Sequence, residues 1–376
     1  FYTECIAAEE NPSETLLEIA EELPRPETGS LFNDTKCYLG IVKAVTAPLR
    51  NGIITLDESG HARLERCITK YLEPVTESTD SDNKTLDELY DLYKSLNIKA
   101  NNKTVSAMLA LRIPSMEEYC YRNGQGGDFF RALGESMAEG YAPDTDMLGS
   151  ITWVYILQGD LQKAAESMSE FETAVKGRKE YAPVLTFFRA LLESGNGKYA
   201  GAAEKLHEIL ALIEVRYGHQ EEYDDNYWTI PDIFISICRD EFCFEFVFCH
   251  SLVLGEIYAG LYKEGLEHSE MLVNYDGRSA WLLNCLVLYR SGLPEEAMRL
   301  LEKNRHEDDE DDEDTYTVRT LRLLAALEQA RYCAGSGKMT EAAKIVRNAG
   351  EHIWKSMPPL CVHEYKQACR LLTDMQ

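Results

Sequence analysis

Three cysteines and a histidine lie close together in one apolar stretch of the chain and raise the question of a metal site. They are Cys238, Cys243, Cys249 and His250. Thiolate and imidazole groups bind Zn²⁺ well, but structural zinc sites usually show CxxC-like pairs. The gaps here are four and five residues within one helical region. The spacing therefore favours buried core thiols, with zinc as the alternative.

Other residues with reactive side chains are scattered. The glycine-rich stretch Asn123–Phe130 precedes a predicted helix, but a phosphate cradle needs a preceding strand and a lysine at its end. Single histidines such as His207 and His363 lie in helical runs without an evident partner. No hydrolase, metalloprotease or kinase motif is present, and nothing assembles a nucleophile, a base and an orienting group. We therefore expect no enzyme, no catalytic or metal-binding residue, no cofactor and no small-molecule substrate.

The charge of the chain bears on its partners. Net charge is −26 over 376 residues, and the sequence pI is about 4.7. Nucleic-acid binding depends on Lys and Arg neutralising phosphates. The excess of acidic residues therefore disfavours RNA as a partner. It favours protein partners that carry basic patches.

The distribution of apolar residues and cysteines bears on location. No stretch approaches the roughly 20 apolar residues of a membrane span. The most apolar window, Ile230–Tyr262, predicts a buried helix pair.

Eleven scattered cysteines indicate reduced thiols inside a cell. A cleaved organellar presequence is compatible with Phe1 as the first residue, as is a trimmed chain. We expect an intracellular protein, with the mitochondrial matrix favoured over the cytosol.

A turn with a fixed spacing recurs between helical runs. It consists of a glycine, four residues and then a small residue, at Gly159/Ala164, Gly197/Ala202, Gly292/Ala297 and Gly337/Ala342, with the variant Gly260/Gly265. Glycine ends a helix in the left-handed conformation without a Cβ penalty. The small residue then faces the preceding helix and allows the two helices to cross closely. The spacing predicts a series of antiparallel helical pairs.

These units resemble tetratricopeptide (TPR) repeats, and some resemble pentatricopeptide (PPR) repeats. Residues Arg278–Asn304 are the most TPR-like, with Trp281 early in the first helix and the small Cys285 in its middle. "EGYAPD", Glu139–Asp144, resembles the junction that ends a PPR unit. The resemblance covers roughly residues 96–354 and implies an all-α fold, an α-solenoid of antiparallel helical pairs.

The pattern predicts five segments. They are an acidic N-terminal arm or linker (1–34), N-terminal helices (35–84), helical repeats (85–215), a long loop (216–230), and further helical repeats (231–376) with an acidic loop at 306–314.

Two pairs of residues are candidate partner contacts. Tyr227 and Trp228 lie in the predicted long loop, where they either fold back over the solenoid or meet a partner. Arg319 and Arg322 are three residues apart on one helix, after eight consecutive carboxylates at Glu307–Asp314. They either pair with this tract or form a small basic spot for RNA or an acidic peptide. The tract itself is either a solvated loop or a docking strip for a basic partner.

The sequence therefore favours a non-enzymatic scaffold or adaptor subunit of an intracellular multiprotein complex, with a ribonucleoprotein among the options, that binds proteins through its solenoid surface. The alternative is an organellar PPR-like RNA-binding factor in RNA processing, stability or translation. PPR repeats read one base each through a few side chains, and no consistent set of such side chains is evident.

Overall fold

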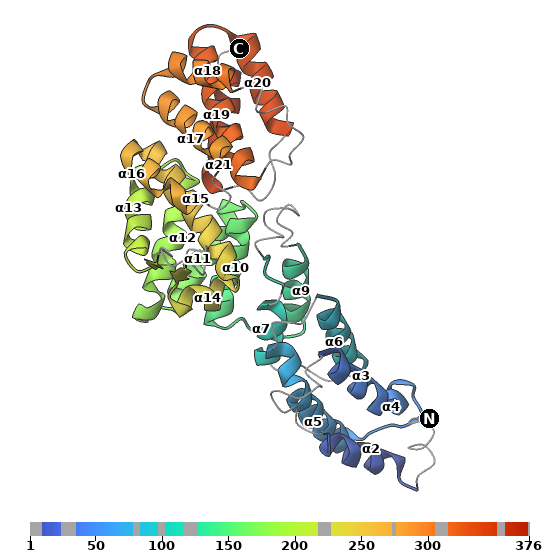
Figure 1. The fold of residues 1–376 in the computed structure, drawn as a ribbon. Helices are drawn as coiled ribbons and strands as arrows, with labels where there is room; N and C mark the ends of the chain where they lie inside the picture. Colours follow the sequence, from blue (N-terminus) through green and yellow to red (C-terminus); the bar gives the residue numbers. More distant parts are fainter. Residues whose placement is uncertain are drawn as a thin grey trace. The chain divides into compact units, whose positions relative to one another are not determined.

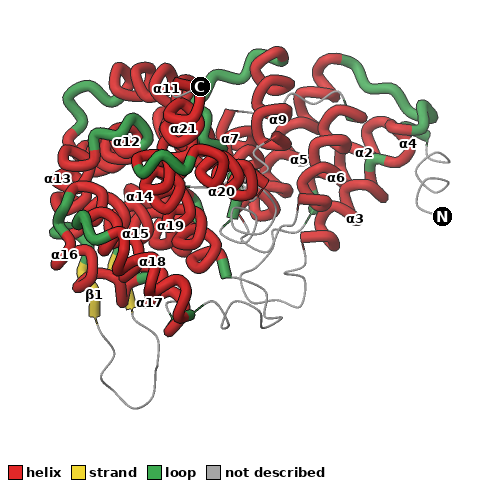
Figure 2. Tube along the Cα trace, turned by 90° about the horizontal axis from the view of Figure 1, so that it is seen from above, coloured by secondary structure: helices red, strands yellow, loops and turns green. Residues whose placement is uncertain are grey.

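The computed structural model of the chain describes residues 10–23, 35–77, 83–96, 102–110, 112–115, 127–216, 227–272, 276–304, 315–351 and 358–374. Nearly all regular structure in these residues is helical (Figures 1 and 2). Two three-residue strands, β1 (Glu214–Arg216) and β2 (Tyr227–Thr229), form one antiparallel pair. The predicted all-α class is confirmed.

The chain divides into two compact units. Unit 1 comprises Phe1–Arg112 and Asp128–Asp144, and unit 2 comprises Ile113–Gly127 and Thr145–Gln376. The division at Asp144/Thr145 falls inside the range 85–215, which the sequence pattern treats as one run of repeats. It coincides with the end of the PPR-like junction Glu139–Asp144.

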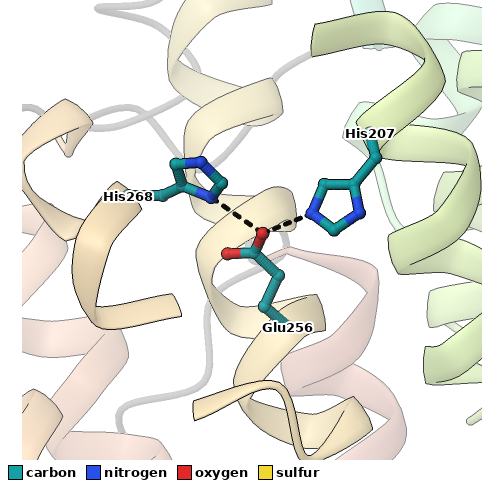
Figure 3. Close-up of side chains that lie close together, drawn as sticks. All are labelled: His207, Glu256 and His268. Atoms are coloured by element: carbon teal, nitrogen blue, oxygen red, sulfur yellow. Dashed lines mark hydrogen bonds and ion pairs between the residues drawn. The ribbon is translucent and has the colours of Figure 1, made fainter. Parts of the chain in front are cut away.

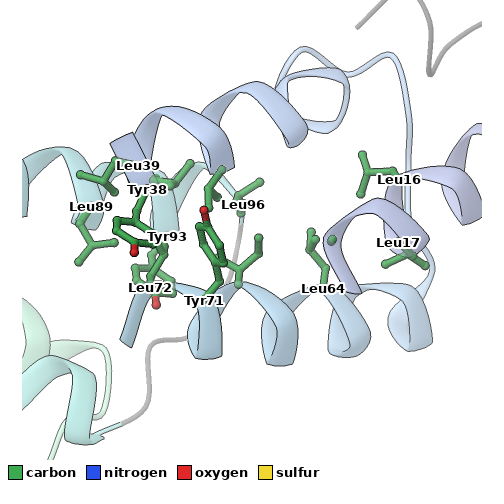
Figure 4. Packing of buried hydrophobic residues seen from close by; sticks show 14 of the residues in the cluster. Leu16, Leu17, Tyr38, Leu39, Leu64, Tyr71, Leu72, Leu89, Tyr93 and Leu96 are labelled. Carbon is green, nitrogen blue, oxygen red and sulfur yellow. The ribbon is translucent and has the colours of Figure 1, made fainter. Parts of the chain in front are cut away.

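Unit 1 contains seven described helices, and all but α9 contribute to one apolar core (Figure 4). These helices are α2 (Pro12–Glu21), α3 (Thr35–Val45), α4 (Ala47–Arg50), α5 (Glu58–Glu77), α6 (Asn83–Ser95), α7 (Asn102–Ala110) and α9 (Gly127–Ala138). Leucines and tyrosines from α3, α5 and α6 form the centre of this core, among them Leu39, Leu72 and Tyr93.

Part of the predicted acidic arm belongs to this core. Leu16 and Leu17 of α2 are buried in the cluster. Arg63 of α5 makes ion pairs with Glu14 and Glu21 of α2, each with an N–O distance of 2.9 Å. The segment Pro12–Glu21 is therefore packed on α5, and an arm or linker does not describe it.

Unit 2 is a series of helices that pack largely in chain order. They are α10 (Thr145–Leu157), α11 (Leu161–Ala174), α12 (Ala182–Ser194), α13 (Tyr199–Leu210), α14 (Asp232–Cys238), α15 (Glu241–Ala259), α16 (Tyr262–Glu267), α17 (Gly277–Arg290), α18 (Pro294–Lys303), α19 (Tyr316–Gly335), α20 (Met339–Glu351) and α21 (Pro359–Asp374), with 3₁₀ turns η1 (Lys179–Tyr181) and η2 (His268–Met271). Neighbours such as α10/α11, α12/α13 and α19/α20 contact each other most extensively.

The last helix departs from this order. Helix α21 contacts α19 and α20, which precede it, but also α12 and α15. The side chain of His363 in α21 bonds to the backbone oxygen of Gly195, just after α12, at 3.1 Å. In an open solenoid each repeat contacts only its neighbours, so α21 closes unit 2 over a long span of sequence.

The glycines of the recurring turns share one backbone geometry. The residues Gly159, Gly197, Gly260, Gly292 and Gly337 have φ between 70° and 85°. This is the left-handed conformation that ends a helix and that glycine adopts without a Cβ penalty. The turn chemistry expected from the sequence is therefore present at all five positions.

The four alanines of the recurring spacing lie near the beginning of the helices that follow the turns. Ala164 belongs to α11, Ala202 to α13, Ala297 to α18 and Ala342 to α20. The backbone N–H of each donates to the backbone oxygen four residues earlier, at 2.9–3.1 Å, which is the α-helical bond. The next helix therefore begins within a few residues of the glycine, and the alanine is already part of it.

The same alanines are packing residues and offer no surface to a partner. The side chains of Ala164, Ala202, Ala297 and Ala342 are all 0% exposed. Ala342 belongs to a buried cluster with Cys333 and Ala334 of α19, the helix before it. The Cys285 thiol of α17 likewise lies 3.7 Å from the backbone oxygen of Ala297. A small side chain at these places allows each helix to lie close to the one before it.

The variant turn shows a close approach of two helices. A Cβ on Gly265 would lie 2.8 Å from Cγ1 of Ile257 and 3.3 Å from the backbone oxygen of Val253. Glycine stands at this position because α16 approaches α15 too closely for alanine.

Helix α15 is the core of unit 2. By length and composition it departs from the expectation that no stretch approaches a membrane span. Within the described residues it is the one helix long and apolar enough to cross a membrane, and most of it is buried inside the unit. An apolar helix covered on all sides by protein is a common core element. The predicted buried helix pair at Ile230–Tyr262 corresponds to α14 and α15.

Two glycines test the role of the turn geometry. A Cβ on Gly292 or on Gly335 would meet nothing within 4 Å, but only Gly292 has a positive φ, 83°. Gly292→Ala should therefore lower the free energy of unfolding by about 1–2 kcal/mol, the cost of a left-handed L-residue. Gly335→Ala should leave stability unchanged or raise it by up to about 1 kcal/mol. Urea unfolding of both variants measures the difference in stability between them. Equal unfolding midpoints would contradict the role of the turn geometry.

Candidate functional site

Two histidines and one glutamate converge in unit 2 (Figure 3). The carboxylate oxygen Oε1 of Glu256 lies 2.6 Å from Nε2 of His207 and 2.8 Å from Nδ1 of His268. These three ligand-capable atoms all lie within 4.8 Å of one another. We call His207, Glu256 and His268 the His–Glu–His cluster.

Three helical segments position this cluster. Glu256 lies near the end of α15, and His207 lies on α13, which contacts α15. The chain then turns at Gly260, where the backbone N–H of Leu261 donates to the backbone oxygen of Glu256 at 2.8 Å. Because Gly265 permits α16 to approach α15, the chain returns over α15 and η2 begins with His268 beside Glu256.

The polar groups of the cluster differ in exposure. The side chain of Glu256 is fully buried, whereas those of His207 and His268 are 37% and 27% exposed. Among the described residues, Oε2 of Glu256 has no hydrogen-bond partner. A buried carboxylate is costly unless it is paired, so the two imidazoles stabilise it. They also separate it from the solvent.

The sequence did not reveal this cluster. His207, for which no partner is evident in the sequence, bonds to Glu256, which lies 49 residues further along the chain. One signal was available: Glu256 is the only charged residue between Phe246 and Ala259. A lone carboxylate in an apolar helix requires a buried partner. The identity of that partner depends on how the helices pack.

A second buried polar network joins four helices. The guanidinium of Arg331 in α19 bonds to Glu328 in the same helix, at 2.5 Å, and to Glu364 in α21. Arg290 in α17 lies 3.5 Å from Glu328, and the Tyr199 hydroxyl in α13 donates to Glu364. Glu328 and Glu364 are less than a tenth exposed. The network ties α21 to the body of unit 2.

An exposed aromatic side chain lies among carboxylates at the start of α15. Phe242 is 68% exposed, the highest value among the large hydrophobic side chains of the described residues. Asp240 and Glu241 precede it, and Glu245 follows. The pKa of Glu245 is raised to about 7, first by burial and then by the negative charges of Glu241 and Asp240. This acidic-aromatic patch, Asp240–Glu245, therefore places three carboxyl groups near one exposed aromatic ring.

The cysteine–histidine group is part of the core. Cys238, Cys243 and Cys249 are free thiols and fully buried, and burial raises the pKa of Cys238 and Cys249. His250 bonds to the Phe246 backbone oxygen at 2.9 Å through Nδ1 and to the Thr317 hydroxyl at 3.1 Å through Nε2. Both ring nitrogens are thus engaged, and burial lowers the pKa of His250 to about 4.

The remaining predicted contact residues are placed only in part. Tyr227 and Trp228 belong to β2, paired with Arg216 and Val215 of β1, so the predicted loop begins and ends with a short strand pair. Arg319 and Arg322 lie on α19, where both are half-buried. The acidic loop 306–314, the middle of the long loop and most of the glycine-rich stretch lie outside the described residues.

Comparison of the sequence with protein-family models and with curated proteins finds no match. The likeness to TPR and PPR repeats therefore depends on the turns and helical pairs of this chain.

The buried ion network should be far more sensitive to mutation than a surface pair. Arg331→Met leaves Glu328 and Glu364 buried without this cation, and the free energy of unfolding should fall by about 3–5 kcal/mol. Arg189→Met is the matched control, because Arg189 and Glu172 form an ion pair with side chains 48% and 38% exposed. It should cost at most about 1 kcal/mol. Urea unfolding measures the free energy of unfolding of both variants. If Arg331→Met lowers it no more than Arg189→Met does, the buried network is no more sensitive than the surface pair.

His250 should make unit 2 less stable in mild acid. In the unfolded chain a histidine has a pKa of about 6.5, above the folded value of about 4. Between these values the unfolded state binds more protons, so stability falls as the pH is lowered through this window, by on the order of 3 kcal/mol in total. An NMR titration of labelled histidines checks the assignment. A pKa of His250 near 6.5 in the folded protein would contradict the prediction.

Proposed function

We propose that this chain is a non-enzymatic helical-repeat scaffold or adaptor subunit that binds basic protein partners in a larger intracellular assembly. The proposal includes a TPR/PPR-like solenoid arrangement of the helices α10 to α20 of unit 2, with α21 packed back on α12 and α15. We also propose the mitochondrial matrix as its compartment, ahead of the cytosol. The free thiols of the described cysteines are in keeping with a reducing compartment.

The observation that carries the proposal is the order of contacts between the helices of unit 2. The first helices of successive pairs touch one another: α10 contacts α12, α12 contacts α15, α15 contacts α17, and α17 contacts α19. The second helix of several pairs contacts the first helix of the next pair, as α13 does with α15. Stacked pairs of this kind present extended surfaces that bind other proteins.

Charge supports a basic partner. The chain has 64 acidic and 38 basic residues, and potentials of opposite sign steer association. The acidic-aromatic patch offers a specific contact, because Phe242 can insert into a partner's apolar pocket while its carboxylates attract Lys or Arg. Aromatic side chains of this kind contribute disproportionately to binding.

The test is affinity purification of the tagged protein, with and without ribonuclease, followed by binding measurements on the recovered partner. We expect the same proteins after ribonuclease treatment, and an affinity that falls as salt rises because the contact is charged. Phe242→Ala should weaken binding about tenfold or more, the range of an interface hot spot.

Ile53→Ala is the matched control. Ile53 is 54% exposed, and no acidic residue lies within three positions of it in the sequence. This variant should bind as wild type does. Loss of all partners with ribonuclease, together with crosslinking of RNA to the chain, would replace the proposal with the RNA-binding alternative.

A further inference from the structure

We propose that the His–Glu–His cluster is a binding site for one divalent transition-metal ion of the zinc type. Two imidazole nitrogens and one carboxylate are a ligand set that binds such ions in many proteins. The proposal does not depend on the scaffold function, because the cluster and the acidic-aromatic patch share no residue.

The positions of the ligand atoms suit a single ion. Zinc–nitrogen distances of about 2.0–2.1 Å place two ligand atoms of a tetrahedral site about 3.3 Å apart. The imidazole nitrogens of His207 and His268 lie 2.6 and 2.8 Å from Oε1 of Glu256. Each nitrogen would withdraw from Oε1 by about 0.5–0.7 Å to admit an ion with ligands at this spacing. The two nitrogens, which lie within 4.8 Å of each other, would also move to this spacing. Side-chain rotation provides such a movement without displacing a helix.

The carboxylate of Glu256 provides an independent observation. One oxygen accepts both imidazole hydrogen bonds, and the other is buried with no partner among the described residues. Figure 3 shows Oε1 between the two rings, with a dashed line to each, and Oε2 without such a line. The terminal torsion of a glutamate has a broad, two-fold profile, so rotation can bring either oxygen to an ion. A divalent cation would also neutralise a fully buried negative charge.

The exposure of the three ligands defines the form of the site. The ion would have a buried carboxylate behind it and two histidines, 37% and 27% exposed, toward the solvent. Three protein ligands with an open side leave a position for water or another ligand. Because the ligands come from α13, α15 and η2, the ion would also cross-link these segments.

Zinc titration of the chelator-treated full-length protein against a chromophoric competitor tests the proposal. Wild type should bind one ion tightly, and saturation should raise the temperature of unfolding, because an ion that binds only the folded state stabilises it. His207→Gln and His268→Gln retain an amide donor for Glu256, so the fold should survive. Each should weaken zinc binding at least 100-fold. Glu256→Gln should also weaken it.

His363→Gln is the matched control, since His363 is another half-buried histidine of unit 2 and lies outside the cluster. Its zinc affinity should equal that of wild type. A second readout needs no variant: zinc should protect His207 and His268, but not His363, from modification by diethyl pyrocarbonate. Absence of a tight stoichiometric site, or a site that persists in the double variant His207→Gln/His268→Gln, would leave the cluster as a hydrogen-bonded carboxylate.

Discussion

The helical pairs of unit 2 depend on how closely two helix backbones can approach each other after a turn. At four turns a fully buried alanine stands in the first turn of the next helix. At the fifth even alanine is too large, because Val253 and Ile257 lie against Gly265. The apolar faces of a pair are shielded from water only if this approach is possible. The same approach returns the chain over α15 and brings His268 to Glu256. The turn therefore determines both the packing and the position of the cluster.

Buried carboxylates join segments that are distant in sequence, because each bonds to side chains of other helices. Glu256 links α13 to η2, and Glu364 links α21 to α13 and α19. Each has cationic or N–H partners that compensate its burial. Such groups contribute little net stability compared with apolar side chains, but removing a partner is costly. They therefore discriminate strongly between the native helix arrangement and arrangements in which the partners do not meet.

The features that the sequence predicted are local ones. Helical runs and the glycine turns follow from residues within about one turn of each other, so the all-α class and the placement of α15 in a core could be inferred from the printed chain. The division at Asp144/Thr145, the packing of α2 on α5 and the meeting of His207, Glu256 and His268 depend on contacts between distant segments. Spacing along the chain does not encode them. The lone Glu256 in an apolar helix indicated that a partner exists, without indicating which one.

The return of α21 to α12 has a consequence for the order of events during protein synthesis. Tyr199 and Glu364, which bond to each other, are 165 residues apart. At about 5–20 residues per second, roughly 10–30 s pass between the synthesis of these two residues. From the time that α12, α13 and α15 are made until α21 is made, the surfaces that α21 later covers are exposed on the nascent chain. Unit 2 therefore presents a temporary apolar and charged face to the ribosome's surroundings, which a chaperone could cover until α21 is made.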